Sequence, residues 1–120
     1  METQTYQGGC HCGAVRYEVT TDLAQVITCN CSICSKSGTI LTFVPEEQFV
    51  LKSGEDVVTD YQFNKKNVHH FFCKVCGIKA FGRGTGAEGK KMAAINVRCL
   101  DNFHELQKEL KTVEMDGRNF

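Results

Sequence analysis

Seven of the eight cysteines lie in three short clusters whose spacing is typical of metal ligands. They are Cys10 and Cys12 (C-x-C), Cys29, Cys31 and Cys34 (C-x-C-x-x-C), and Cys73 and Cys76 (C-x-x-C followed by glycine). Zinc holds thiolates at about 2.3 Å in a tetrahedron, so that neighbouring sulfurs lie roughly 3.8 Å apart. Two cysteines one or two residues apart on a turn can therefore supply one edge of such a tetrahedron.

The seven clustered cysteines divide naturally into a four-sulfur site and a three-sulfur site. Four protein ligands close a structural zinc site, whereas three leave a position open for chemistry. We expect the C-x-C and C-x-x-C pairs to form the structural site and the triplet to form a separate site. The spacing also allows the triplet to combine with the C-x-x-C pair. The isolated Cys99 is in register with Ile95 and Val97, and we expect it to be a buried core thiol.

Length, composition and the first residues of the sequence indicate the number of domains, the compartment and the partners to expect. A chain of 120 residues fits a single domain, residues 1–120. The polar start, Met1–Gln7, lacks the features of a signal peptide, and no apolar run approaches the roughly 20 residues of a membrane helix. We therefore expect a cytoplasmic protein, in which thiols stay reduced and serve as metal ligands rather than disulfides. With 14 basic and 14 acidic residues, neither nucleic acid nor a membrane surface is an expected partner.

The elements that carry the clusters are predicted to be mainly strands. Val15, Tyr17 and Val19 alternate with polar residues, the period of a half-buried strand. Strands are predicted at Ala14–Thr20, Ala24–Thr28, Thr39–Val44, Phe49–Lys52, Val57–Phe63, His69–Phe72, Lys79–Arg83, Lys91–Arg98 and Lys111–Met115. Many short strands favour a β-sandwich-like or barrel-like domain.

One helix is predicted near the C-terminal end of the sequence. Asn102 can cap it, and Glu105 three residues later completes a capping box. Phe103, Leu106 and Leu110 then share one face. This helix is expected to serve packing rather than chemistry.

The order of the three cysteine motifs, followed by Asn96-Val97-Arg98-Cys99-Leu100-Asp101, resembles the glutathione-dependent formaldehyde-activating enzyme family, to which centromere protein V also belongs. The resemblance runs from about Gly8 to Leu110. It implies a zinc-stabilised β-tent fold, an antiparallel, sandwich-like arrangement with one short C-terminal helix. It also implies two zinc ions per chain, one structural and one exchangeable. The implied ligands are Cys10, Cys12, Cys73 and Cys76 for the structural zinc, and Cys29, Cys31 and Cys34 for the labile or catalytic zinc.

The family's named activity joins glutathione to formaldehyde and gives S-(hydroxymethyl)glutathione, formally a carbon–sulfur lyase reaction. The triplet suits this chemistry. Three thiolates make zinc a weak Lewis acid that acidifies water poorly, while a soft thiol is a good fourth ligand. The thiolate is the nucleophile, and proximity would help it add to an aldehyde. We therefore expect Cys29, Cys31 and Cys34 to be the catalytic set, with a small thiol and a small aldehyde as partners.

Two other functions use the same residues. Cys31 and Cys34 form a C-x-x-C that could act as a redox dithiol, although the sequence predicts no helix opening at Cys31. The chain could also be a non-enzymatic, zinc-stabilised binding module. Metal stoichiometry separates these functions, because two zincs, one lost readily to glutathione, favour the enzyme.

Several further residues could do chemistry but have a simpler explanation. His11 is expected to point away from the cysteines that flank it, and His69 and His70 to face opposite sides of a strand. His104 is another possible ligand or base. Lys36, just after the triplet, could meet a substrate carboxylate, although a solvated lysine is the commoner case.

Overall fold

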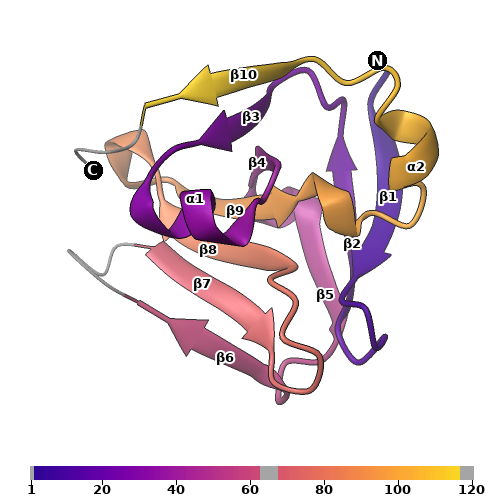
Figure 1. Ribbon diagram of the computed structural model, residues 1–120, viewed down its shortest axis with the longest axis vertical. Coiled ribbons are helices and arrows are strands. Elements are labelled where there is room, and N and C mark those ends of the chain that lie inside the picture. The colour runs from indigo at the N-terminus through magenta and orange to yellow at the C-terminus, as the bar shows by residue number, and fades with distance from the viewer. Residues whose placement is uncertain (1, 63–67, 117–120) are drawn as a thin grey trace.

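The computed structural model describes residues 2–62 and 68–116. These residues form a three-stranded sheet, ordered β1-β2-β5, and a seven-stranded sheet, ordered β10-β3-β4-β9-β8-β7-β6 (Figure 1). The strands are β1 (Gln4–Gly9), β2 (Arg16–Thr21), β3 (Val26–Cys29), β4 (Leu41–Pro45), β5 (Phe49–Ser53), β6 (Val58–Tyr61), β7 (Val68–Cys73), β8 (Phe81–Thr85), β9 (Lys91–Asn96) and β10 (Thr112–Met115). The helical segments are α1 (Ser32–Ser37), α2 (Phe103–Leu106) and the 3-10 turns η1 (Glu46–Gln48), η2 (Ala87–Gly89) and η3 (Val97–Cys99).

The three-stranded sheet is built on the alternation of β2. Tyr17 and Val19 are fully buried, whereas Arg16 and Glu18 are only partly covered. β2 pairs antiparallel with β1 on one side and with β5 on the other. β1 is absent from the predicted strands because its glutamines and glycines carry little β-propensity. It forms because β2 supplies a partner.

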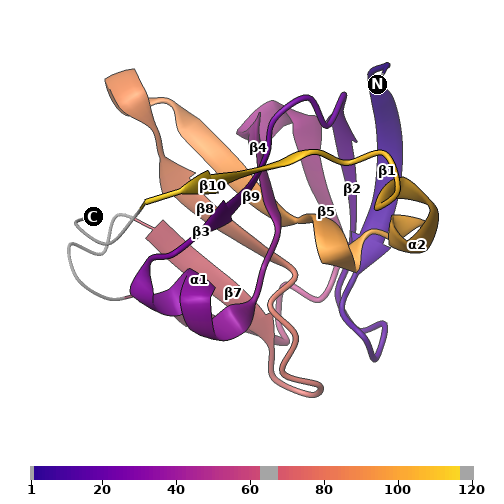
Figure 2. The ribbon, with the colours of Figure 1, turned by 45° about the horizontal axis from the view of Figure 1, so that its top comes forward.

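The larger sheet is antiparallel except at one edge. From β3 to β6, neighbouring strands run in opposite directions, and the predicted antiparallel class is correct for them. β10 instead pairs with β3 in parallel, with Thr112 opposite Val26. A parallel pairing requires a long connection between the two strands. Here the connection runs through most of the chain (Figure 2).

Aromatic side chains fill the space where the two sheets meet. Tyr17 of β2 lies 5.3 Å from Phe49 of β5, between ring centroids, and Phe49 lies 5.0 Å from Phe81 of β8. Phe71 of β7 stacks on Phe81 at 5.0 Å. Such offset and tilted pairs add to the free energy gained by burial. In Figures 1 and 2 the strands of the smaller sheet cross β7 and β8 steeply, so one aromatic cluster serves both sheets.

The predicted strands are present, with ends that shift by a few residues. The predicted strand Val57–Phe63 corresponds to β6, and its last residue lies outside the described residues. The predicted strand Lys91–Arg98 ends at Asn96, where the chain turns into η3. Cys99 therefore lies in a 3-10 turn rather than in a strand, and its side chain packs against the hydrophobic core, so the expected core thiol is only partly buried.

The predicted capping box is wrong. α2 spans only Phe103–Leu106, and the Asn102 side chain makes no capping hydrogen bond. Asn102 has a φ of −101° and a ψ of 24° rather than an extended backbone, which keeps its side chain away from the first turn. The predicted apolar face does pack against the core, through Leu106 with Phe103 and Leu110 beside it.

One helix was not predicted. α1 follows β3 directly, with Cys31 at its N-cap and Gly38, at φ 68°, closing its C-terminal end. It contains six residues and lacks the long apolar period by which helices are recognised. The fold is thus mainly β, with a second short helix at the cysteine triplet.

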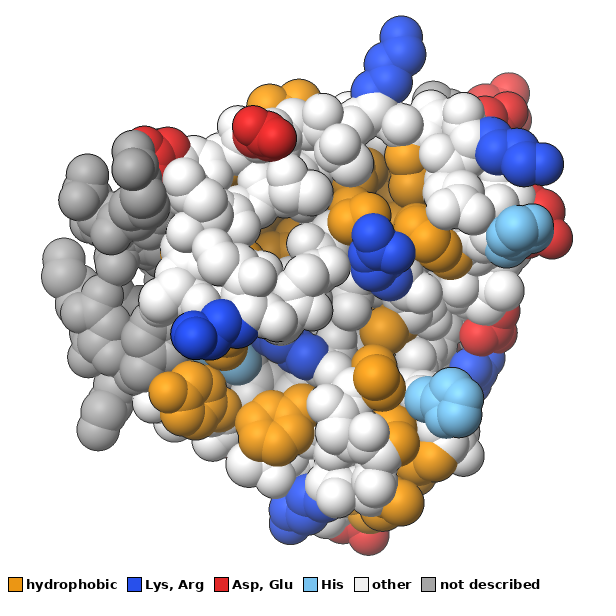
Figure 3. Space-filling model, in the orientation of Figure 1, with side chains coloured by type: hydrophobic (Ala, Val, Ile, Leu, Met, Phe, Trp, Pro, Cys, Tyr) orange, Lys and Arg blue, Asp and Glu red, His pale blue; other side chains and the backbone are white. Residues whose placement is uncertain are grey.

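The surface gives no sign of a single dominant charge. On the face drawn in Figure 3, basic and acidic side chains are scattered among neutral ones. Within the described residues, no helix is both long enough and apolar enough to cross a membrane.

Candidate functional site

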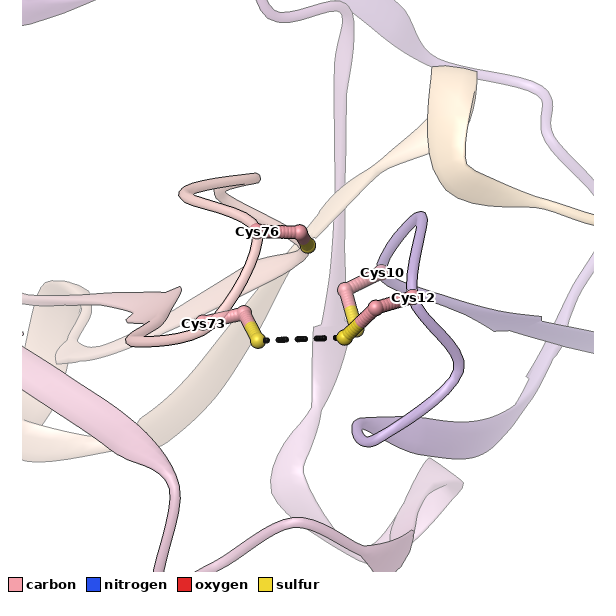
Figure 4. Close-up of side chains that lie close together, drawn as sticks. All are labelled: Cys10, Cys12, Cys73 and Cys76. Atoms are coloured by element: carbon pink, nitrogen blue, oxygen red, sulfur yellow. Dashed lines mark hydrogen bonds between the residues drawn. The ribbon is translucent and has the colours of Figure 1, made fainter.

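The four-cysteine cluster comes from two turns that belong to different sheets. Cys10 and Cys12 lie on the turn between β1 and β2, Cys73 is the last residue of β7, and Cys76 lies on the turn that leads from β7 to β8 (Figure 4). The Sγ atoms of Cys10 and Cys12 are 3.6 Å apart, as are those of Cys12 and Cys73. All four sulfurs lie within 4.8 Å of one another. These separations are close to the roughly 3.8 Å edge of a zinc–thiolate tetrahedron.

Backbone N–H groups of both turns donate hydrogen bonds to the sulfurs. The Val15 N–H donates to Cys10 Sγ at 3.3 Å, and the Val75 N–H donates to Cys73 Sγ at 3.4 Å. Gly77 has a φ of 79°, a conformation that favours glycine, and its N–H donates to the Cys73 carbonyl at 2.8 Å. Hydrogen bonds of this kind orient metal ligands and stabilise the thiolate form.

The four thiols differ in how easily they ionise. The N–H groups of Cys12 and Ile78 lower the pKa of Cys76 to about 6. The Ala14 N–H also favours a Cys12 thiolate, yet loss of hydration and the neighbouring thiols, which oppose a further negative charge, together raise the pKa of Cys12 to about 11. Four adjacent thiolates thus need a cation between them, and a soft tetrahedral ion such as zinc fits this donor set.

The cysteine triplet forms a second cluster within the larger sheet. Cys29 ends β3, Cys31 caps α1, and Cys34 lies inside α1, with all three sulfurs within 4.8 Å of one another. Cys31 and Cys34 are buried, and Cys29 is half-buried. The structure thus groups the sulfurs four and three, and not in the alternative arrangement of the triplet with Cys73 and Cys76.

Neighbouring elements hold the triplet loop in place. The Asn30 N–H donates to the Met115 carbonyl of β10 at 3.2 Å. The Ser35 hydroxyl donates to the Asn30 carbonyl at 2.9 Å, which ties α1 back to the loop. The parallel strand β10 therefore supports the triplet, although it lies far away in the sequence.

Burial governs ionisation in the triplet. It raises the pKa of Cys34 to about 11, and the adjacent Cys31 thiol adds to that rise. Burial also opposes a charge on Cys31, but the Cys34 N–H and the thiols of Cys34 and Cys29 lower its pKa overall. Of Cys31 and Cys34, Cys31 is therefore the first to form a thiolate. Three thiols on one side of a possible ion fit zinc with an open fourth position.

Lys79 was not among the predicted site residues. Burial lowers the pKa of Lys79, and the charges of Cys34 and Cys31 offset part of this shift. Its positive charge also reaches His70. Thr39, which is buried, lowers the pKa of Cys34 through its hydroxyl. The sequence shows Lys79 only as the third residue after Cys76, with no signal that it reaches the triplet.

The four histidines have different surroundings. His11 is exposed, as expected, and neither thiol group within the described residues includes a histidine. His69 and His70 differ as predicted: His69 Nδ1 lies 2.8 Å from an Asp60 carboxylate oxygen at the surface, whereas His70 is buried. His104 is exposed and contacts Gln107.

Two other predicted residues also lie outside the clusters. Lys36 is exposed on α1, in agreement with a solvated lysine. Cys99 belongs to neither group of clustered sulfurs, and its Sγ donates to the Lys79 carbonyl at 3.9 Å. Burial raises the pKa of Cys99 to about 11, so its thiol stays protonated at neutral pH.

Comparisons with known proteins agree with this arrangement. The sequence model described as glutathione-dependent formaldehyde-activating enzyme matches residues 5–115. A crystal structure of a Rhodobacter sphaeroides protein superposes with a TM-score of 0.78 at 27% sequence identity, over 91% of this chain and 99% of that one. The matched residues include all three cysteine clusters and the elements that hold them. The chain belongs to the glutathione-dependent formaldehyde-activating enzyme family.

Proposed function

We propose that the protein is a zinc-dependent carbon–sulfur lyase that joins glutathione to formaldehyde and also catalyses the reverse reaction. The observation that carries this proposal is the three-thiol cluster, which lacks a fourth sulfur or a histidine among the described residues. Cys29, Cys31 and Cys34 would hold an exchangeable zinc, and the four-cysteine cluster would hold a structural one. The family of the chain supports glutathione and formaldehyde as substrates.

The chain's own residues would prepare the reactants. A zinc ion at the triplet would supply an open position for a soft thiolate ligand. Cys31 and Cys34 are buried, so water has limited access to that side of the site. The substrate thiolate then attacks the formaldehyde carbon, a carbon–sulfur bond forms, and the carbonyl oxygen takes up a proton. The reverse reaction removes that proton, breaks the carbon–sulfur bond and releases the aldehyde.

Exchange spectroscopy by NMR tests this reaction. We expect the wild-type protein to speed the interconversion of glutathione, formaldehyde and their adduct above its rate in buffer. Cys31→Ser should return the rate to the buffer value, because it removes one of the three sulfurs that would hold the exchangeable zinc. Cys99→Ser is the matched control, since it removes a thiol outside both clusters, and it should keep the wild-type rate. Equal exchange with wild-type protein and with buffer alone would contradict the proposal.

One observation favours a second function, a thiol redox protein. The chain passes from β3 into a helix with Cys31 at its N-cap, contrary to the sequence-based expectation. Helix N-termini stabilise the thiolate of redox C-x-x-C motifs. Against it, α1 has only six residues and Cys29 shares the cluster. A Cys31–Cys34 disulfide that persists in metal-loaded protein under glutathione buffer would favour redox chemistry over the lyase.

A further inference from the structure

The segment Asn96–Asp101 supplies no sulfur to either cysteine cluster, yet it binds segments that flank the cysteine motifs. The Asp101 N–H donates to the Gln7 carbonyl at 2.9 Å, shortly before the C-x-C turn. The Val97 N–H donates to the Ile40 carbonyl at 2.7 Å, in the connection from α1 to β4. The segment therefore contacts the surroundings of both clusters.

Asn96, the first residue of this segment, also holds the chain that follows the C-x-x-C motif. Its side chain is 7% exposed, and the amide donates to the Lys79 carbonyl at 2.9 Å. The Asn96 backbone N–H donates to the next carbonyl, that of Ala80, at 3.1 Å. The Ile78 carbonyl, directly before Lys79, accepts from the Cys73 N–H at 3.0 Å. Asn96 therefore holds one end of a short segment whose other end belongs to the four-cysteine cluster.

The strand beside Asn96 packs on the triplet. β9 lies between β8 and β4 in the larger sheet (Figure 1), and Asn96 is opposite Leu41 of β4. Leu41 is buried and forms one apolar cluster with Cys31, Cys34 and Ile27. Because buried side chains are close-packed, a shift of Asn96 would move Leu41 and, through it, two sulfurs of the triplet.

The Asn96 side chain uses both of its hydrogen-bonding ends. While its amide nitrogen donates to the Lys79 carbonyl, its Oδ1 accepts from the Arg98 N–H at 3.2 Å, at the start of η3. An amide is a short, neutral group that combines a donor with an acceptor. Asn96 therefore fixes the turn into η3 and the segment after the C-x-x-C motif at the same time.

We propose that Asn96 is a positioning residue for the exchangeable metal: through its bond to the Lys79 carbonyl, it holds the segment of the four-cysteine cluster against the strand that packs on the triplet. This proposal rests on the proposed function, because it requires a metal ion at the triplet. It also makes the two clusters interdependent, since a metal in the four-cysteine cluster fixes the segment to which Asn96 is bound.

Cobalt binding at the triplet tests this role without measuring turnover. The protein is first loaded with one zinc ion per chain, and added cobalt is followed through its thiolate-to-cobalt and d–d absorption bands. Asn96→Ser keeps an oxygen that accepts from the Arg98 N–H but is too short to reach the Lys79 carbonyl. Asn96→Ala removes both hydrogen bonds. We expect both variants to weaken cobalt binding by about 5-fold or more and to alter the d–d bands.

Thr42→Val is the matched control. Thr42 is buried in β4, and its hydroxyl donates to the Gln25 carbonyl at 2.9 Å. The substitution therefore also removes a hydrogen bond between a side chain and a backbone carbonyl from the larger sheet. Thr42 is opposite Ile95 rather than Asn96 and makes no bond to the segment after the C-x-x-C motif. It should bind cobalt within about 2-fold of the wild type.

Each outcome decides for or against the role of Asn96. Wild-type affinity in both Asn96 variants would refute it. Wild-type affinity in Asn96→Ser with weaker binding in Asn96→Ala would assign the effect to the Arg98 hydrogen bond and overturn the proposal. Equal weakening by Thr42→Val would also overturn it, because the affinity would then follow the stability of the sheet. If the wild type itself takes up no cobalt, the proposed function fails as well. Zinc content and near-ultraviolet circular dichroism confirm that each variant is folded.

Discussion

At the scale of single residues, burial sets the protonation of His70. Its side chain is 8% exposed, and burial lowers its pKa to about 4, with the positive charge of Lys79 adding to the shift. His69, its neighbour in β7, faces the surface and pairs with Asp60. Two adjacent histidines on one strand thus meet opposite environments, because side chains alternate across a sheet.

His70 should make the folded protein sensitive to acid. The unfolded chain binds a proton at His70 below about pH 6.5, whereas the folded chain does so only below about pH 4. Stability is therefore lost as the pH falls through this window, by up to about 3 kcal/mol. We expect His70→Gln to lack this loss. Urea unfolding from pH 7 to pH 4 measures it.

Comparing the wild type with His70→Gln separates the effect of His70 protonation from other effects of acid. Metal release at low pH acts on both proteins, so the difference between their unfolding free energies is the quantity to follow. Curves that remain parallel between pH 7 and pH 4 would contradict the role of His70.

At the scale of elements, the turn between β1 and β2 depends on close backbone approach. A Cβ atom added at Gly9 would overlap the Val15 carbonyl oxygen, a backbone atom that has no rotamer to escape into. At Gly86, in the loop before β9, an added Cβ would instead meet the flexible Met92 side chain at 3.2 Å. Gly9 should therefore not accept an added Cβ atom, whereas Gly86 should accept one.

Gly9→Ala should damage both the sheet and the metal site. We expect a loss of about 2 kcal/mol or more in the free energy of unfolding, because the turn must open to accept the methyl group. Cys10 and Cys12 would move with the turn, so the four-cysteine cluster should bind its metal less tightly. Gly86→Ala, the matched control, should change stability by less than about 1 kcal/mol. Denaturant unfolding and metal analysis measure both effects, and equal stability of the two variants would refute the argument.

At the scale of the whole molecule, the two cysteine clusters connect different parts of the fold. The four-cysteine cluster joins the three-stranded sheet to the seven-stranded sheet, since one pair lies on each (Figure 4). The triplet lies within one short segment, Cys29–Cys34, at the end of β3. Metal in the first cluster would cross-link distant parts of the chain, whereas metal in the second would cross-link only a local loop.

Loss of one ligand should therefore have unequal effects. Zinc binding in small peptides is worth roughly 10–16 kcal/mol, and a whole domain is stable by roughly 5–15 kcal/mol. We expect Cys73→Ser to unfold the protein or to lower its stability by more than about 5 kcal/mol. Cys34→Ser should lose one metal per chain and remain folded. Metal analysis and thermal unfolding distinguish these outcomes, and similar destabilisation by both substitutions would contradict the assigned roles.

Much of this protein can be predicted from its sequence because the informative patterns are local. Ligand spacing within a turn is local, and so are the strand period of β2 and the apolar face at Leu106. Other features depend on contacts between distant segments. β1 forms only beside β2, β10 pairs in parallel with β3, and α1 forms where the chain leaves β3 without an apolar period of its own.

The sequence by itself determined which cysteines could serve as metal ligands and how they are grouped within each motif. Which motifs meet depended on the tertiary structure, because sequence spacing allowed the triplet to join either pair. Lys79 belongs wholly to the second kind of information. It is an ordinary lysine in the chain, and only the fold half-buries it and lets the charges of Cys31 and Cys34 act on its pKa.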